Sequence, residues 1–351
     1  MSLLDVFSGL FGRRFTDLAI DLGTANTLVA LPGQGVVVNE PSMAAVERGT
    51  NRVVAVGNEA KSLVSRSSAD YFAVNPLRDG VVADYDVTEG MIAAFINRVA
   101  PREHAWDARP RVVVCIPCGA TMVERRAAFE AVIQAGAVEA YLLEEPLAAA
   151  LGAGLPVASG GAAMVVDIGG GTSEIAVIAH GGIEASTSLR LAGNRMDEAI
   201  SMHLRDALGI RVSERTCEVI KTKIGSAAPF EDGRERDMII SGQDILSGQP
   251  KEVTIKSEDV RAALAVPCEE LLRRVRETFR KTGPEVASDI IKNGILLTGG
   301  GGTLSGLDRY LTEQLEIPVH TSDTALTNVV LGCLKALEEP EVLGSSLARA
   351  K

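Results

Sequence analysis

Two apolar runs that flank an acid and a glycine turn stand out in the pattern of the chain. Residues 165–178 read VVDIGGGTSEIAVI, with Asp167 before three glycines and two hydroxyl residues. Apolar runs bounded by turn residues predict two buried strands joined as a hairpin. A tight hairpin needs only two turn residues of the Asn-Gly kind. The additional glycines and hydroxyls therefore indicate a turn with a chemical role.

The same pattern occurs near the start of the chain. Residues 19–31 read AIDLGTANTLVAL, and an offset of 146 positions places Asp21 on Asp167 and Gly23 on Gly169. Each copy is a strand, an Asp-x-Gly turn with small residues, a hydroxyl and a second strand. Internal similarity on this scale predicts two related domains that face each other.

Two such hairpins on either side of a cleft predict a phosphate clamp. Backbone N–H groups in glycine turns form nests for phosphate oxygens, and small side chains let a phosphate approach. Asp21 and Asp167 are the expected ligands of Mg²⁺, held through its water molecules. Four hydroxyls add possible donors, those of Thr24, Thr27, Thr172 and Ser173. The glycine-lysine string of a P-loop is absent from the sequence.

A third glycine run offers a competing interpretation. Residues 295–315 predict a short strand, a glycine turn and an amphipathic helix, and Gly300, Gly302 and Gly306 nearly fit a dinucleotide-binding fingerprint. A Rossmann dehydrogenase is therefore the main alternative fold. It would need its own βαβ unit around this turn and would leave the paired hairpins unexplained. We expect this turn to lie against the nucleoside and α-phosphate of a nucleotide.

Composition and charge narrow the classes of function. The 351 residues are 46% hydrophobic, which suits a sizeable core and about two domains. A formal net charge of −11 argues against a nucleic-acid partner. Five cysteines do not form a secreted disulfide framework and favour the cytoplasm. The uncharged stretch 146–166 is broken by prolines and glycines, so we expect no transmembrane helix.

Five segments in this order resemble the ATPase superfamily of actin, heat-shock chaperones and sugar kinases: DLGTANTLV, EEPLAAALGAGLP, DIGGGTSE, CEVIKTKIG and LTGGGGTLSGL. Within it the chain is similar to the MreB family of bacterial actins, on IDLGTANTLV, PLRDGVVADYDVTEGMI, PCGATMVERRA and ASDIIKNGILLTGGG. The resemblance covers about Phe15 to Leu337. It implies an α/β, actin-like (ribonuclease H-like) duplicated fold, with ATP and Mg²⁺ in a cleft between two domains.

The resemblance also assigns roles to individual residues. It places the first phosphate turn at Asp21, Gly23, Thr24, Ala25 and Asn26, and the second at Asp167, Gly169, Gly170, Gly171 and Thr172. Glu218 and Lys221 would contact the adenosine, and Gly299, Gly300 and Gly301 would lie under the base and ribose.

The same resemblance assigns the catalytic roles to two residues. Glu145 would orient the attacking water and Thr172 would assist from the other side, with the neighbouring Glu144 as the alternative carboxylate. Two positions depart from the family pattern, because Ser173 replaces a threonine and Asn194 replaces an aspartate. Nucleotide binding remains the expectation, and the hydrolysis rate stays open.

The implied domain division follows the actin plan. Domain IA comprises 15–32, 78–145 and 324–351, and its subdomain IB is 33–77. Domain IIA comprises 146–181 and 256–323, and its subdomain IIB is 182–255. Helices at 144–154 and 327–339 would connect the halves.

The first 14 residues predict a membrane contact. An apolar stripe typical of an interfacial helix is formed by Leu3, Leu4, Phe7, Leu10 and Phe11. The alternative is a short helix packed on its own domain, and the resemblance favours the membrane. Trp106 is a second candidate contact.

The function implied is that of a membrane-associated actin. We expect a slow ATPase that forms homopolymeric, paired filaments in the cytoplasm, on the inner face of the cytoplasmic membrane. With cell-wall elongation proteins it would organise cell-wall synthesis and maintain rod shape. Two alternatives stay open: another bacterial actin that positions plasmids or organelles, and a small-molecule kinase on the same fold.

Overall fold

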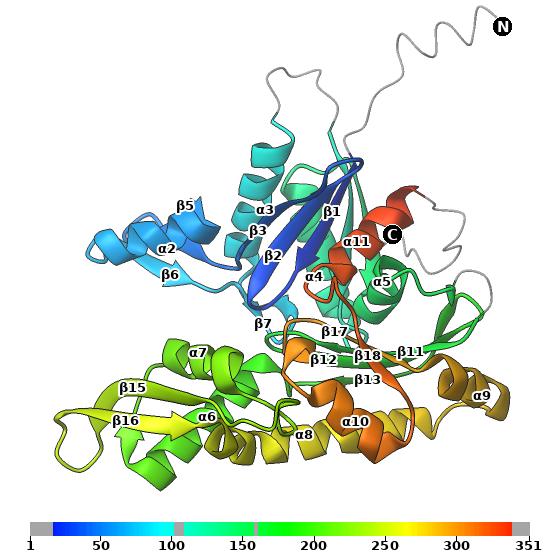
Figure 1. Cartoon of the computed structure of the whole chain (residues 1–351). Coiled ribbons are helices and arrows are strands. Elements are labelled where there is room, and N and C mark those ends of the chain that lie inside the picture. The colour runs from blue at the N-terminus through cyan, green and yellow to red at the C-terminus, as the bar shows by residue number, and fades with distance from the viewer. Residues whose placement is uncertain (1–16, 102–108, 158–160, 339–351) are drawn as a thin grey trace, which may run out of the picture.

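Two five-stranded sheets of identical topology organise the computed structural model, which describes residues 17–101, 109–157 and 161–338. The first sheet has the order β3-β2-β1-β9-β10 and the second the order β13-β12-β11-β17-β18. In each, the first three strands pair antiparallel and the last three pair parallel. We call the halves built on these sheets the first and second lobes (Figure 1).

The strands of the first sheet are β1 (Asp17–Leu22), β2 (Asn26–Leu31), β3 (Gly35–Pro41), β9 (Arg111–Ile116) and β10 (Glu139–Glu144). Those of the second are β11 (Ala163–Ile168), β12 (Ser173–Ala179), β13 (Gly182–Leu189), β17 (Ile295–Thr298) and β18 (Val319–Thr321). The predicted duplication extends to the register. Asp21 pairs with Leu28 across the first hairpin, and Asp167 pairs with Glu174 across the second, so the offset of 146 holds for both members of each pair.

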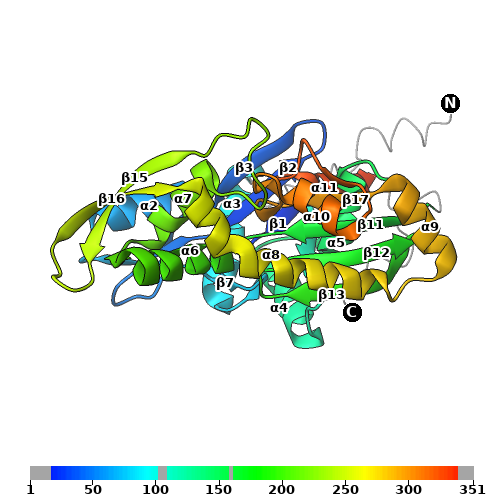
Figure 2. The ribbon, with the colours of Figure 1, turned by 60° about the horizontal axis from the view of Figure 1, so that its bottom comes forward.

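Helices cover the outer faces of both sheets. The first lobe carries α3 (Tyr85–Val99) and α4 (Met122–Gln134), which bury Phe95 and Val132 against β1 and β9. In the second lobe this position is taken by α8 (Ser257–Phe279), α9 (Pro284–Asn293) and α10 (Leu307–Leu315), and α6 (Gly193–Leu208) and α7 (Glu214–Ile224) pack on α8. Figure 2 shows α8 crossing the outer face of the second lobe toward α9. None of the described helices is long and apolar enough to span a bilayer.

Two helices lie between the sheets and pack against both (Figure 1). These are α5 (Glu145–Gly152) and α11 (Asn328–Glu338), which match the predicted connecting helices within two residues at each end. They cross with their backbones in contact: a Cβ on Gly332 would overlap the Ala148 carbonyl, and a Cβ on Gly152 would overlap that of Asn328. Only glycine permits this approach.

A small subdomain branches from each lobe. The first has β4 (Ala44–Glu47), β5 (Val53–Val56), α2 (Gly57–Arg66) and β6 (Tyr71–Val74), and the ribbon returns through β7 (Leu77–Arg78) and β8 (Val81–Val82). The second combines α6 and α7 with β14 (Ile210–Arg211), β15 (Asp237–Asp244) and β16 (Pro250–Lys256). The predicted branch points at 33 and 182 come one strand too early, because β3 and β13 are edge strands of the large sheets. Their partly polar, partly exposed sequences resemble those of an outlying subdomain.

Candidate functional site

The turns of the two hairpins meet at the interface between the lobes. A Cβ on Gly170 would lie 2.9 Å from the Cβ of Ala25, and one on Gly171 would lie 2.7 Å from Thr24 Oγ1. The offset of 146 relates Thr24 to Gly170 and Ala25 to Gly171, so the contact has approximate two-fold symmetry. Both predicted turns therefore lie in contact across this interface, and a side chain at either glycine would push the lobes apart.

Two aspartates lie at the strand ends beside these turns. Burial raises the pKa of Asp21 to about 6, although its Oδ1 accepts a hydrogen bond from the Cys115 thiol at 3.0 Å, which lowers the pKa. Burial raises the pKa of Asp167 to about 8, and the negative charges of Asp21 and Glu174 add to the effect. Both groups are thus held in an environment that disfavours their ionised forms.

Glu145 faces the same cluster from the first turn of α5. Burial raises its pKa well above the usual range, and the negative charges of Glu174, Asp167 and Asp21 raise the pKa further. Glu144 lies apart from the cluster and accepts a hydrogen bond from Arg125 at 3.0 Å. The structure therefore separates the two neighbouring carboxylates that the sequence left open, and places Glu145 with the aspartates.

Glu174 was missed as a site residue. It lies on β12 opposite Asp167, is 1% exposed, and burial raises its pKa to about 7 despite hydrogen bonds from Ser188 and the Cys118 amide. The signal was present in the sequence, because SEIAVIA has one charge within an otherwise buried strand. Buried charges are rare unless they are paired or bind a metal.

The cluster of Asp21, Glu145, Asp167 and Glu174 is chemically suited to a divalent cation. No ion pair among the described residues includes any of the four. Carboxylate oxygens are the ligands that Mg²⁺ prefers, and it usually keeps several of its waters. Within the described ranges, no three acidic, thiol or imidazole groups are arranged to hold a metal directly. The residues thus fit an ion bound through water and through phosphate oxygens.

The third glycine run packs beneath the second hairpin. It leads into η2 (Gly301–Thr303). A Cβ on Gly299 would overlap Asp167 Oδ1, and one on Gly301 would overlap the side chain of Ile168. Gly300 is exposed and has more room, with Leu326 as its nearest neighbour at 3.5 Å. Gly299 and Gly301 therefore allow close packing on β11, and Gly300 remains open to a ligand.

The N-terminus of α6 is tied to the second turn. The amides of Gly193 and Asn194 donate to the Gly169 and Gly170 carbonyls at 3.0 and 2.9 Å. The side chain of Asn194 is not needed for this contact, so its substitution for aspartate leaves the backbone link intact. Lys221 on α7 donates to the Gly193 carbonyl at 2.9 Å.

Lys221 is held in place by an ion pair. Its Nζ lies 2.9 Å from Asp197 Oδ2, and both side chains are largely buried. Asp197 Oδ1 is buried and has no hydrogen-bond partner among the described residues. Glu218, one turn earlier on α7, is exposed. The structure thus brings Lys221 beside the second turn and leaves the Glu218 side chain directed to solvent.

Residues 79 and 80 of the first lobe also take part in the contact between the two turns. The Gly80 amide donates to Thr24 Oγ1 at 2.8 Å, and a Cβ on Gly80 would lie 3.2 Å from Thr172 Oγ1. Next to it, Asp79 pairs with Arg190 of the second lobe at 3.4 Å. Asp79 and Gly80 were not predicted as site residues, because their partners lie far away in the sequence.

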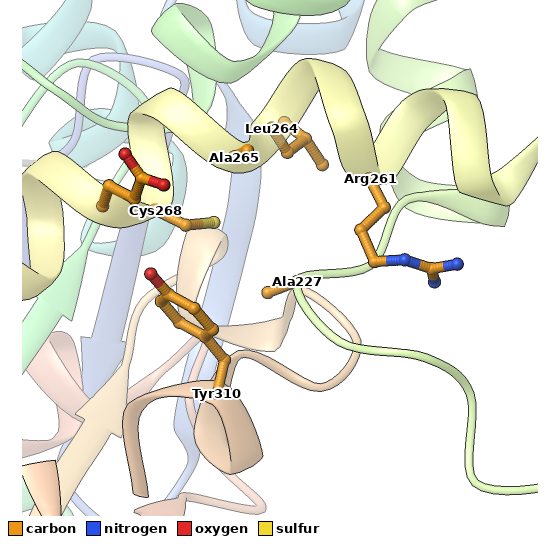
Figure 3. Close-up of a pocket in the computed structure, with 7 residues that line it drawn as sticks. Ala227, Arg261, Leu264, Ala265, Cys268 and Tyr310 are labelled. Carbon is orange, nitrogen blue, oxygen red and sulfur yellow. The ribbon is translucent and has the colours of Figure 1, made fainter. Parts of the chain in front are cut away.

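Some predicted residues fall outside the described part of the chain. These are Leu3, Leu4, Phe7, Leu10, Phe11 and Trp106. A separate pocket of about 90 Å³ lies between α8 and α10, with walls that include Leu264, Cys268 and Tyr310 (Figure 3). It contains none of the predicted site residues.

The raised pKa values predict how stability depends on pH. A carboxyl whose pKa is higher in the folded state stabilises the fold at low pH and loses that effect as pH rises through the folded value. In EDTA and without nucleotide, we expect the unfolding temperature to fall between about pH 5 and pH 8, the window set by Asp21, Glu174 and Asp167. Asp167→Asn should raise it at pH 8 by at least about 3 °C, measured by thermal denaturation. A wild-type unfolding temperature that rises across this window would contradict the assignment.

Comparisons with known proteins agree with this architecture. The family model described as "MreB/Mbl protein" matches residues 15–345. The cell shape-determining protein MreB of Escherichia coli strain K12 is 44% identical over 349 residues, which cover 98% of this chain and 99% of that protein.

Solved structures extend the comparison to the fold. MreB5 of Spiroplasma citri bound to AMPPNP superposes with a TM-score of 0.86 at 34% identity, covering 93% of this chain and 97% of that one. A MamK chain from a double helical filament superposes with a TM-score of 0.77 at 19% identity, covering 92% and 99%. The predicted duplicated actin-like fold is thereby confirmed, and the chain belongs to the MreB/Mbl family of cell shape-determining, actin-like cytoskeletal proteins.

Proposed function

We propose that this protein is an ATP-dependent filament protein that works beneath the cytoplasmic membrane. The observation that carries the proposal is the meeting of two glycine turns beside four carboxyl groups, of which Asp167 and Glu174 are buried and Asp21 and Glu145 are half-buried. Glycine turns suit phosphate oxygens, and a carboxylate cluster suits the accompanying cation. The related MreB5 of Spiroplasma citri was crystallised with AMPPNP, a nucleoside triphosphate analogue, which supports the same ligand class.

Residues of both lobes would contact the nucleotide, each set at a different part of it. The backbone of 23–26 and of 169–172 would bind the phosphates, and Asp21 and Asp167 would hold Mg²⁺ through water. Gly300, the exposed glycine of the third run, would lie against the nucleoside. Lys221, fixed by Asp197, and the exposed Glu218 would contact the adenosine. The division into domains IA, IB, IIA and IIB, with β3 and β13 counted in the large domains, belongs to the same proposal.

Mg²⁺·ATP, when bound, supplies a terminal phosphoryl group that can be transferred to water. Phosphoryl transfer needs mainly positioning and electrostatic stabilisation from the protein. Glu145 would orient the attacking water and accept its proton on the carboxylate, with Thr172 placed across the interface. Buried surroundings make this carboxylate a stronger base than an exposed one, once it is ionised.

Self-assembly and cell-wall partners complete the proposal. The MamK neighbour forms a double helical filament, and a head-to-tail contact that does not close produces such polymers. We infer paired filaments that cooperate with cell-wall elongation proteins to maintain rod shape. A small-molecule kinase on this fold is the alternative; it would show hydrolysis stimulated by a sugar or acid acceptor and no polymer.

Calorimetry with ATP tests the binding part of the proposal. We expect saturable ATP binding in Mg²⁺ that weakens at least about 10-fold in EDTA, because the carboxyl cluster then faces the phosphates without a cation. ATP binding that is equally tight with and without Mg²⁺ would contradict the assigned roles of Asp21 and Asp167.

Membrane binding is predicted from the N-terminal apolar stripe. Deleting residues 1–14 should abolish flotation with anionic liposomes, because several apolar side chains lose their place at the interface. The full-length double variant Phe7→Asp, Phe11→Asp serves as a second test, and Trp106→Ala should have a smaller effect. Unchanged flotation of both N-terminal variants would refute the membrane role of this segment.

A further inference from the structure

Glu174 reaches from the second lobe to the first. Its Oε2 accepts a hydrogen bond from the Cys118 amide at 3.1 Å, and Cys118 lies just after β9 in the first lobe. Its Oε1 accepts one from Ser188 Oγ at 2.5 Å, on the neighbouring strand β13 of its own sheet. The carboxylate is therefore fixed at both oxygens, once within its own lobe and once across the interface.

The same loop of the first lobe rests directly on β13. A Cβ on Gly119 would lie 2.8 Å from Ser188 Cβ and 3.1 Å from Ser188 Oγ. Real Cβ atoms essentially never come so close to a neighbour, so position 119 must remain glycine for the lobes to approach this far. The contact thus depends on three features: the Cys118 amide, Gly119 without a side chain, and the carboxylate that Ser188 holds.

This contact is coupled to Glu145 through the first sheet. Glu144, the last residue of β10, is the register partner of Ile116, the last residue of β9. The loop at 117–119 and Glu145 are therefore the immediate continuations of two paired strands of the same sheet.

We propose that Glu174, Ser188 and the 117–119 loop form a latch between the lobes that sets the closed position in which Glu145 faces the phosphate turns. The inference rests on the proposed function and deepens it. Glu174 is a positioning residue, because it acts through backbone hydrogen bonding across the interface. Its hydrogen-bonding capacity carries the effect, and its charge does not.

The conservative variant separates these two properties. Glu174→Gln retains an acceptor for the Cys118 amide and a group that can bond to Ser188, and it removes the charge. Glu174→Ala removes both bonds, and Gly119→Ala opposes the approach from the other lobe. Ser188→Ala is the mildest variant, since it removes only the donor that orients the carboxylate.

Two measurements on the full-length protein test the latch. Hydrogen exchange of the segment 117–121, without nucleotide, should be faster by at least about 10-fold in Glu174→Ala and Gly119→Ala and unchanged in Glu174→Gln. In ATP turnover, the same two variants should lose at least about 10-fold in kcat relative to wild type, with KM changed less than about 3-fold. Ser188→Ala should fall between.

The outcomes separate the latch from the function it serves. A Glu174→Gln variant in which segment 117–121 loses protection from exchange as fully as in Glu174→Ala would overturn the latch, since charge would then carry the effect. Wild-type exchange in Gly119→Ala would overturn it as well. If the wild-type protein neither binds nor hydrolyses ATP, the proposed function fails, while the exchange measurement still decides whether the latch exists.

Discussion

Replacing Glu145 with glutamine is expected to reduce ATP hydrolysis by at least about 100-fold, equivalent to about 2.7 kcal/mol of activation free energy, and to leave ATP binding within a few-fold of wild type. Glutamine keeps the shape of the side chain and cannot accept the proton of the attacking water. Binding should survive because the phosphate turns and the two aspartates are untouched. Single-turnover kinetics and calorimetry would measure the two quantities separately.

The matched control is the adjacent carboxylate. Glu144 pairs with Arg125 away from the cluster, so Glu144→Gln should change hydrolysis by less than about 5-fold. Equal losses of ATP hydrolysis in the two variants would show that Glu144 and Glu145 act only through their negative charge. Full activity in Glu145→Gln would remove Glu145 from the mechanism.

Replacing Gly332 with alanine is expected to destabilise the protein by about 2 kcal/mol or more. Helix propensity alone favours alanine over glycine by about 1 kcal/mol in a helix interior. Here the new Cβ would overlap the backbone carbonyl of Ala148 on α5, and a backbone cannot move aside as a flexible side chain does. The steric cost of overpacking, about 1–3 kcal/mol or more, should therefore decide the sign.

Urea denaturation measures this effect against a neutral substitution. Gly182 in β13 has nothing within 4 Å of its built Cβ and no positive φ, so Gly182→Ala should leave stability nearly unchanged. A Gly332→Ala variant as stable as wild type would show that α5 and α11 separate easily. Because these two helices join the lobes, we also expect the variant to weaken ATP binding.

The hairpins could be predicted from the sequence because their pattern occurs twice along the chain. The hairpins at Asp21 and Asp167 were predicted because an offset of 146 aligns them, and the register of both sheets confirms the alignment. The connecting helices were predicted from the resemblance to actin-like proteins. The third strands β3 and β13 were misplaced, because an exposed edge strand lacks the continuous apolar pattern of a central one.

The contacts between segments that are distant along the chain could not be predicted from the sequence. The Gly80 amide meets Thr24, and the Cys118 amide meets Glu174, in each case 56 positions apart. No periodicity records which main-chain amide faces which side chain across two lobes. The packing role of Gly299 was likewise hidden, because it depends on where β11 places Asp167.

ATP binding between the lobes is expected to drive assembly into filaments. High-speed sedimentation of the purified protein with Mg²⁺·ATP, with ATP in EDTA, and without nucleotide would measure this dependence. We predict pelleting that depends on both Mg²⁺ and ATP and that persists in Glu145→Gln, because hydrolysis is not needed for assembly. A protein that binds ATP by calorimetry yet stays in the supernatant under every condition would contradict the claim.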